Sequence, residues 1–281
     1  MVISSESLDK KNMAVMSQRY ISNELTHFVG RHQLKEQEHY ETLIRILKEG
    51  VLKYSPDSQP SSGLVSINYP DAKASKNEMF NPPVICFCDI PLADLSIHMK
   101  KYSKFGVSFL KSFLTKQGAN PVFYIASDSV YDNISEAKHI PLGDFFDKML
   151  KEYHDLTWEQ AMRLKKEHFE RCGLDLNQER SLTADEIQKI QRTEDPEGER
   201  WNKLNFFLLY NILSFLKFFE NDRSDEDPDN YYMEREWRLL GNLKFDLRDV
   251  YRIIIPKAYA KDLRRDLPEY NGQISFSDNE K

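Results

Sequence analysis

Three charged residues near the C-terminal end of the chain have types and a spacing that suit acid–base chemistry. The segment EREWRLLGN places Glu234, Glu236 and Arg238 at every second position. Because alternate residues of a β-strand face the same way, this pattern predicts two carboxylates and a guanidinium in a row. Trp237 and Leu239 then anchor the opposite face in the core. The spacing also fits a solvent-exposed strand face with a local charge pair, and it leaves both interpretations open.

A histidine near the N-terminus is the second candidate. In the segment LTHFVG a strand pattern places Leu25, His27 and Val29 on one face, so the imidazole lies among apolar neighbours. The ring is either a functional group or a core histidine whose nitrogens bind the backbone.

The cysteines predict neither a metal site nor a disulfide framework. Cys86 and Cys88 share one side of the strand pattern VICFCDIPL, and Cys172 is the third cysteine of the chain. This pair, even with the distant His98, lacks the further ligands that a zinc site needs. We expect buried thiols in a core strand and a protein of a reducing compartment.

The elements that must position these groups follow from composition and periodicity. The chain has 281 residues, 40% hydrophobic content and a formal net charge of -6, which predicts a globular core and no strong basic field for nucleic acid. The sequence contains no GxGxxG, Walker-type, GxSxG or HExxH motif. This argues against Rossmann dehydrogenases, P-loop nucleotide hydrolases, α/β-hydrolases and zincins. The N-terminus lacks the apolar region of a secretory signal, and the apolar run Asn205–Phe219 is too short to cross a bilayer. These observations predict a cytoplasmic protein without membrane contact.

Strand patterns at both ends of the chain flank a helical block, which predicts an α+β fold. We expect a flexible tail over residues 1–19, a single domain over residues 20–281 and a helical insertion over about residues 143–220. The local predictions are a helix that ends at Gly50, a long loop over residues 53–83, a helix that begins at Thr157, a capping box at Thr183 and Glu186, and an apolar helix over Trp201–Phe219.

Taken in order, several segments resemble the bacterial abortive-infection AbiGi family. They are LTHFVG, ILKEGVL, VICFCDIPL, KYSKFGVSFL, GANPVFYI and YYMEREWRLL. The resemblance extends from Tyr20 to Phe276, and CFCDIP and EREWRLLGN are its most specific parts. Members of that family are labelled antitoxins of phage-resistance modules. The resemblance therefore implies phage defence and a cognate toxin or antitoxin partner.

The same arrangement is more distantly similar to the ADP-ribosyltransferase superfamily, including the DarT-like toxins. That resemblance implies a split two-sheet α+β core with NAD as substrate in a cleft. It places His27 at the first motif position and Glu236 at the last. Glu234 and Glu236 then correspond to the paired glutamates of the arginine-modifying branch. Three residues compete for the second position, namely Cys88, Asp89 and Tyr102.

The resemblance also implies roles. Glu236 would stabilise the positive charge that builds on the ribose as the nicotinamide bond breaks, and Glu234 would orient the acceptor. His27 would hold the adenosine ribose, and Phe28 or Tyr102 would stack on the nicotinamide. Arg31 and Asp89 complete the implied NAD contacts. This hypothesis requires His27 and Glu236 to converge on one cleft.

Two functions remain open on the sequence alone. One is NAD-dependent ADP-ribosyl transfer to a macromolecule, either protein, RNA or DNA. The other is a catalytically inactive antitoxin or accessory subunit that binds a partner toxin. In that case the exposed side of the Trp201–Phe219 helix would supply an apolar contact surface.

Overall fold

A computed structural model gives the fold of the chain. It describes residues 22–30, 35–54, 65–68, 72–133, 138–177, 181–224, 227 and 230–278. The tail predicted over residues 1–19 and Arg31 lie outside these ranges. Within them the chain mixes helices with a multistranded sheet, so the predicted α+β class is confirmed.

One seven-stranded sheet organises the body of the protein. Its order is β15-β14-β6-β1-β5-β12-β7, and every neighbouring pair is antiparallel except β14 and β15. In chain order the strands are β1 (Glu24–Phe28), β5 (Val84–Cys88), β6 (Gly106–Leu110), β7 (Asn120–Pro121), β12 (Glu236–Leu240), β14 (Val250–Ile255) and β15 (Gln273–Phe276). Hydrogen bonds join these seven strands into a single sheet. The finer prediction of an ADP-ribosyltransferase-like split two-sheet core stays a prediction.

Helices and short turns cover both faces of this sheet. The helices are α1 (Glu36–Glu49), α2 (Ser96–Lys101), α3 (Lys111–Lys116), α4 (Leu142–Arg171), α5 (Ala184–Arg192), α6 (Pro196–Phe207) and α7 (Ala260–Asp266). Helix α1 buries Leu43 and Leu47 against the face that carries Leu25 and Phe109, and this is the main core. The helix ends at Gly50 as predicted, since φ of 63° there needs a residue without a side chain. The opposite face is packed beneath α2, where Leu95 and Ile254 are buried.

Within the described residues, four two-stranded ladders accompany the large sheet. They are β2 (Val51–Leu52) with β13 (Leu243–Lys244), β3 (Ser66–Ile67) with β4 (Phe80–Asn81), β8 (Phe123–Ala126) with β11 (Leu216–Phe219), and β9 (Val130–Asn133) with β10 (Lys138–Pro141). The predicted loop over residues 53–83 was wrong in part, because it contains β3, β4 and the 3-10 turn η2 (Ala74–Lys76). Residues 55–64 and 69–71 of that loop lie outside the described ranges.

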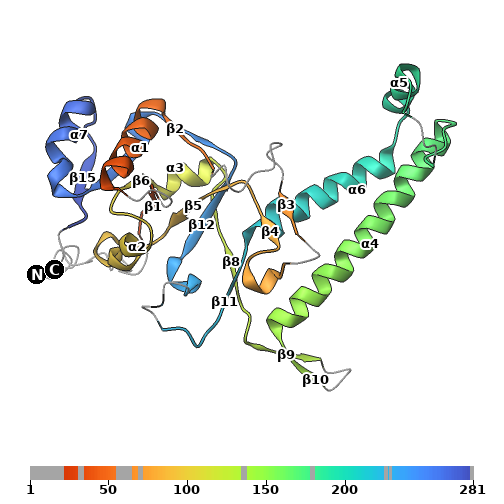
Figure 1. The fold of residues 1–281 in the computed structure, drawn as a ribbon, viewed down its shortest axis with the longest axis horizontal. Helices are drawn as coiled ribbons and strands as arrows, with labels where there is room; N and C mark the ends of the chain where they lie inside the picture. Colours follow the sequence, from red (N-terminus) through yellow and green to blue (C-terminus); the bar gives the residue numbers. More distant parts are fainter. Residues whose placement is uncertain are drawn as a thin grey trace, which may run out of the picture.

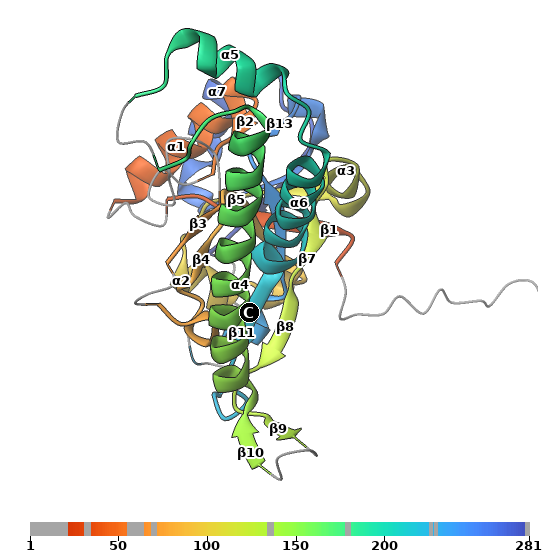
Figure 2. The same cartoon turned by 90° about the vertical axis from the view of Figure 1, so that its right-hand side faces the viewer.

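A pair of helices projects from the sheet as an arm. Helices α4 and α6 run side by side away from the body, and α5 lies at their far end (Figures 1 and 2). We call residues 142–207 the arm. Its helices confirm the predicted helical block in outline, whereas the division of the chain into domains stays a prediction.

Two details of the helical block differ from the prediction. Helix α4 is continuous over 30 residues, so Thr157 lies inside it and is no N-cap. The Thr157 hydroxyl instead donates to the carbonyl of His154 one turn earlier. The apolar helix predicted to end at Phe219 stops as an α-helix at Phe207 and continues through a π-helical turn, η4 (Leu208–Ile212), and a 3-10 turn, η5 (Leu213–Phe215). The last four residues then form β11, because they pair in parallel with β8.

Among the described residues, no helix is both long enough and apolar enough to cross a membrane.

Candidate functional site

The turn that leads into β12 sets the positions of the two glutamates. The 3-10 turn η6 (Tyr231–Glu234) ends at Glu234, and Arg235 follows with φ of 45°, in the left-handed region. A side chain disfavours this conformation, and the carbonyl of Arg235 is held by the backbone N–H of Asp89 at 3.1 Å. The predicted strand row is therefore wrong for Glu234, which precedes the strand. It is confirmed for Glu236 and Arg238, which share a face of β12.

Glu236 lies inside the protein with its charge neutralised. The residue is 5% exposed and Arg238 is 9% exposed, so the interpretation as a solvent-exposed strand face is wrong. The Arg238 Nε donates to Glu236 Oε1 at 2.7 Å, and the Lys217 Nζ lies 3.4 Å from Oε2. Burial by itself raises the carboxyl pKa, but the charges of Arg238 and Lys217 outweigh it and hold the pKa at about 2. Glu236 is therefore ionised and compensated at neutral pH.

Arg238 joins this ion pair to the base of the arm. Its Nη1 donates to the carbonyl of Ser214 at 2.6 Å and to that of Leu216 at 3.3 Å. These carbonyls belong to η5 and β11, the segment that returns the chain from the arm to the body. The guanidinium thus holds Glu236 and the returning segment together.

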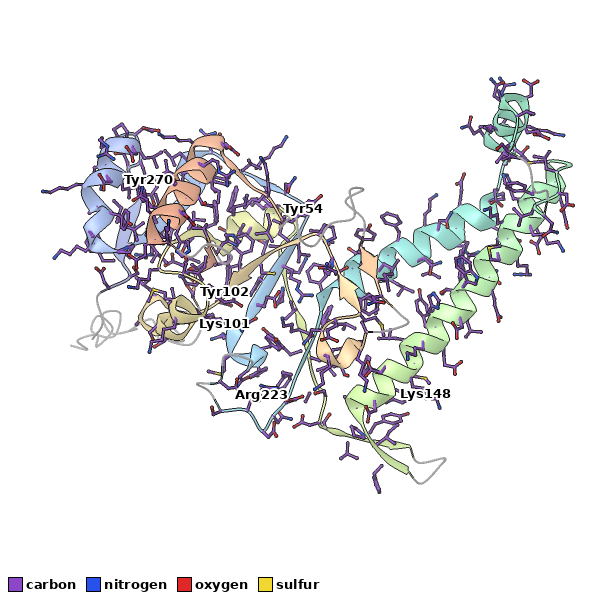
Figure 3. All side chains as sticks on the ribbon, in the orientation of Figure 1. Tyr54, Lys101, Tyr102, Lys148, Arg223 and Tyr270 are labelled. Carbon is purple, nitrogen blue, oxygen red and sulfur yellow. The ribbon has the colours of Figure 1, made fainter. Side chains whose placement is uncertain are left out.

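Glu234 is the second compensated carboxylate. Its Oε1 accepts from the Tyr102 hydroxyl at 2.6 Å and from the Lys101 Nζ at 2.7 Å. The Lys217 Nζ lies 4.0 Å from its Oε2, so Lys217 faces both glutamates. Figure 3 shows Lys101 and Tyr102 at the C-terminal end of α2, beside β12. Glu234 is 7% exposed. Its carboxylate faces two lysines and a phenol of the protein and not solvent.

Aromatic rings surround the two lysines. The Lys101 and Lys217 ammonium groups lie 4.9 Å and 4.1 Å from the centre of the Tyr231 ring, within the range of cation–π attraction. The Phe28 ring stacks on Tyr102 with 6.3 Å between centres. Phe28, Tyr102, Glu234 and Glu236, four of the predicted site residues, therefore lie in one cluster.

His27 lies on the other face of the sheet, which corrects the predicted convergence. Thr26 is paired with Cys88, and Cys88 is paired with Glu236, so these three residues share a face. His27 follows Thr26 in a regular strand and points the opposite way, where its ring meets Phe87 of the main core. Because the sheet lies between them, His27 and Glu236 do not meet across a cleft.

The imidazole of His27 has the contacts of a core histidine. Its Nδ1 donates to the carbonyl of Cys86 at 2.8 Å, since a carbonyl only accepts. Burial lowers the pKa of the ring, and the hydrogen bond to Cys86 opposes this only in part. The neutral, backbone-bound imidazole is one of the two interpretations that the sequence leaves open.

The two other predicted residues, Asp89 and Cys88, have contacts that support the fold. Asp89 is buried and forms an ion pair of 2.6 Å with Lys111. Cys88 occupies the register position between Thr26 and Glu236, and burial raises the pKa of its thiol to about 12, so it stays protonated. Its neutral thiol supplies no charge to the cluster.

Sequence reasoning missed three members of the cluster. Lys101 and Lys217 add positive charge beside that of Arg238. His98 on α2 is 5% exposed, with neither ring nitrogen hydrogen-bonded within the described residues. A lysine in the apolar run NFFLLYNILSFLKFF was a usable signal, because a buried lysine needs a carboxylate partner. Burial lowers the pKa of His98 while Glu234 opposes it, so the ring is neutral at physiological pH.

Comparison with known proteins places this site in a family. A family model described as "Putative abortive phage resistance protein AbiGi, antitoxin" matches residues 73–275. The curated "Abortive phage resistance protein AbiGi" of Lactococcus lactis subsp. cremoris is 32% identical over 93 residues, which are 30% of this chain and 37% of that relative. The match thus spans little more than a third of the relative's length. No solved structure matches. The matched range contains the arm, both lysines and both glutamates, whereas His27 precedes it.

Proposed function

Because the chain belongs to the AbiGi family of abortive phage resistance proteins, as its sequence predicted, we propose that it is an antitoxin that neutralises a partner toxin by binding it. The observation that carries this proposal is the internal compensation of both candidate catalytic carboxylates. Glu236 pairs with Arg238, and Glu234 with Lys101 and Tyr102. A carboxylate that must stabilise a ribosyl cation has to be free to face it, and these two face protein cations instead.

The binding proposal predicts that the cluster supports the fold but does not contact the toxin. Removing the Tyr102 hydroxyl with Tyr102→Phe takes one hydrogen bond from Glu234 and leaves the ring in place. We expect this variant to bind the toxin encoded with the chain as tightly as the wild type does, and to protect cells that produce that toxin. Calorimetric titration of the purified toxin measures the first outcome, and growth on co-expression measures the second.

The control is His27→Gln, on the other face of the sheet, with thermal unfolding of each variant to establish that it is folded. A wild-type chain that fails to bind the toxin contradicts the proposal. So does a folded Tyr102→Phe variant that loses protection.

A second candidate function is NAD-dependent ADP-ribosyl transfer, and one observation favours it. Four residues that the distant resemblance places around NAD, namely Phe28, Tyr102, Glu234 and Glu236, lie together although they come from separate segments. For this function Lys217 and Arg238 have to release Glu236 when substrate binds. His27 then has no part in the reaction, because the sheet separates it from Glu236.

The transfer hypothesis predicts label in a macromolecule after incubation of the pure protein with radiolabelled NAD and cell lysate. Digestion with nuclease or protease then identifies the acceptor class. Glu236→Gln should abolish the labelling and His27→Gln should retain it. Absence of label with the wild-type chain, or equal label with Glu236→Gln, excludes this site as a transferase.

A further inference from the structure

Helix α2 buries a histidine whose ring nitrogens lack hydrogen-bond partners. His98 is 5% exposed, and among the described residues no group bonds to its Nδ1 or Nε2. Buried polar atoms are usually paired, because each unpaired one costs free energy. A neutral imidazole has one N–H donor to leave unpaired, whereas an imidazolium has two donors and a charge. The protonated ring therefore fits this place much worse than the neutral ring does.

The surface beneath α2 is mostly apolar. Leu95 at the start of α2 is buried with Cys88, Ile90 and Ile254, and Met99 packs against the same cluster. Burial raises the pKa of the Cys88 thiol to about 12, so this group is neutral as well. A charge in such surroundings is costly unless a partner of opposite charge binds it directly.

Two charged groups act on the ring in opposite directions. Burial is the main reason that the pKa of His98 is lowered, while Glu234 of η6 raises it and Lys101 of α2 lowers it. The Lys101 Nζ lies 2.7 Å from the Glu234 carboxylate, so the two charges largely cancel at the ring. Other ionisable groups on the elements around α2 are paired: Tyr102 with Glu234, Lys217 with both glutamates, Arg252 of β14 with Glu24, and Asp89 with Lys111.

Helix α2 depends on its packing because it is short. It has six residues, and among the described residues no side chain caps its N-terminus. The amides of Met99 and Tyr102 each bond to a carbonyl one turn earlier, at 2.9 Å. A helix of this length does not persist in water by itself, so loss of packing on the sheet also opens its backbone. Lys101 and Tyr102 then leave Glu234.

We propose that α2 is an acid-sensitive latch, in which protonation of His98 opens the helix and releases Lys101 and Tyr102 from Glu234. An imidazole in water has a pKa of about 6.5, and the lowered pKa of the buried ring means that the closed helix binds the proton less tightly. The neutral ring therefore stabilises the closed form above about pH 6.5, and this stabilisation is lost as the pH falls below that value. Opening also takes Tyr102 off the Phe28 ring, so access to the buried cluster depends on pH.

Hydrogen–deuterium exchange of the full-length chain, read by NMR, tests the latch. Exchange is compared at about pH 7.5 and about pH 5.5, after correction for the intrinsic pH dependence of amide exchange. In the wild type we expect protection of the Met99 and Tyr102 amides to fall about tenfold, because the released ring gains its proton one pH unit below a pKa of about 6.5. His98→Phe keeps a planar ring without ionisable nitrogens, and its protection should stay constant. His154→Phe is the matched control, since the His154 side chain is 39% exposed on α4, and it should behave as the wild type does.

Three results would overturn the latch. Equal protection of the wild-type α2 amides at both pH values means that protonation of His98 does not open the helix. A folded His98→Phe variant that still opens in acid assigns the effect to another group. Protection that falls as much in α1 as in α2 indicates global unfolding and no local opening. The wild type alone decides the first and third results, so the test remains decisive even if His98→Phe does not fold.

Discussion

Replacing Arg238 with methionine should lower the free energy of unfolding by about 3–5 kcal/mol, measured by urea denaturation at pH 7. The substitution removes the guanidinium that donates to Glu236 at 2.7 Å and leaves a carboxylate that is 5% exposed beside Lys217 alone. It also takes a donor from the carbonyls of Ser214 and Leu216. A buried charge without its partner is among the most destabilising changes that one substitution makes.

Two comparisons isolate the ion pair as the cause. Arg248→Met removes an arginine that is 83% exposed and pairs with Asp246, and it should cost less than about 1 kcal/mol. A double variant, Glu236→Leu with Arg238→Met, should recover part of the loss, because it removes both charges together. If the double variant is less stable than Arg238→Met alone, the unpaired carboxylate is not the reason for the destabilisation.

Local patterns in the sequence predicted the elements whose formation depends on neighbours in the chain. The period of Leu43 and Leu47 with Gly50 at the end predicted α1, and Thr183 with Glu186 predicted the start of α5. In each case a helix face or a cap is complete within a few residues. No contact with a distant segment is needed to determine where such helices form, so the local sequence is enough to predict them.

The run over residues 216–219 shows why other elements escaped prediction. Four apolar or mixed residues after an apolar helix fit a continued helix and a buried strand equally well. What decides is the parallel pairing of Leu216 with Phe123, which lies 93 residues earlier. Long-range pairing of this kind overrides local preference and leaves no periodic signal.

Long-range strand pairing also explains why the predicted site residues His27 and Glu236 lie on different faces of the sheet. Alternation correctly placed His27 with Leu25 on one face, and Glu236 with Arg238 on one face. Whether these two faces coincide depends on the register between β1, β5 and β12, and a shift of one residue reverses the answer. The observed pairing of Thr26 with Cys88 sets His27 and Glu236 apart. The sequence thus predicted some residues of the polar cluster, but neither its lysines nor which of the candidates would share it.

The contacts of this buried cluster extend to the base of the arm. Arg238 binds both the carboxylate of Glu236 and the returning segment at Ser214, so the charges at the start of β12 hold the base of the arm on the sheet. A second contact supports the same segment: the Asn77 side chain donates to the carbonyl of Phe218 and accepts from its N–H. These buried charges therefore have a structural role at the base of the arm, which needs no reaction at their carboxylates.

Acid should destabilise the wild type more than a Glu236→Gln variant. The pKa of Glu236 is lowered to about 2 in the folded protein, whereas an unfolded glutamate has a pKa of about 4.3. A lowered folded pKa contributes stability above the unfolded pKa, and that contribution is lost as pH falls toward the folded pKa. The wild type should therefore lose about 3 kcal/mol from this group between about pH 5 and pH 2, through Glu236 protonation alone.

Glutamine does not titrate, so comparison with the Glu236→Gln variant isolates the contribution of the Glu236 carboxyl group. The difference in unfolding free energy between wild type and Glu236→Gln, followed by urea denaturation over the same pH range, should shrink as the pH falls. Other carboxylates titrate in both proteins and cancel in this difference. A difference that stays constant with pH means that Glu236 is not held ionised by Arg238 and Lys217. In that case the compensation of Glu236 no longer favours toxin binding over ADP-ribosyl transfer.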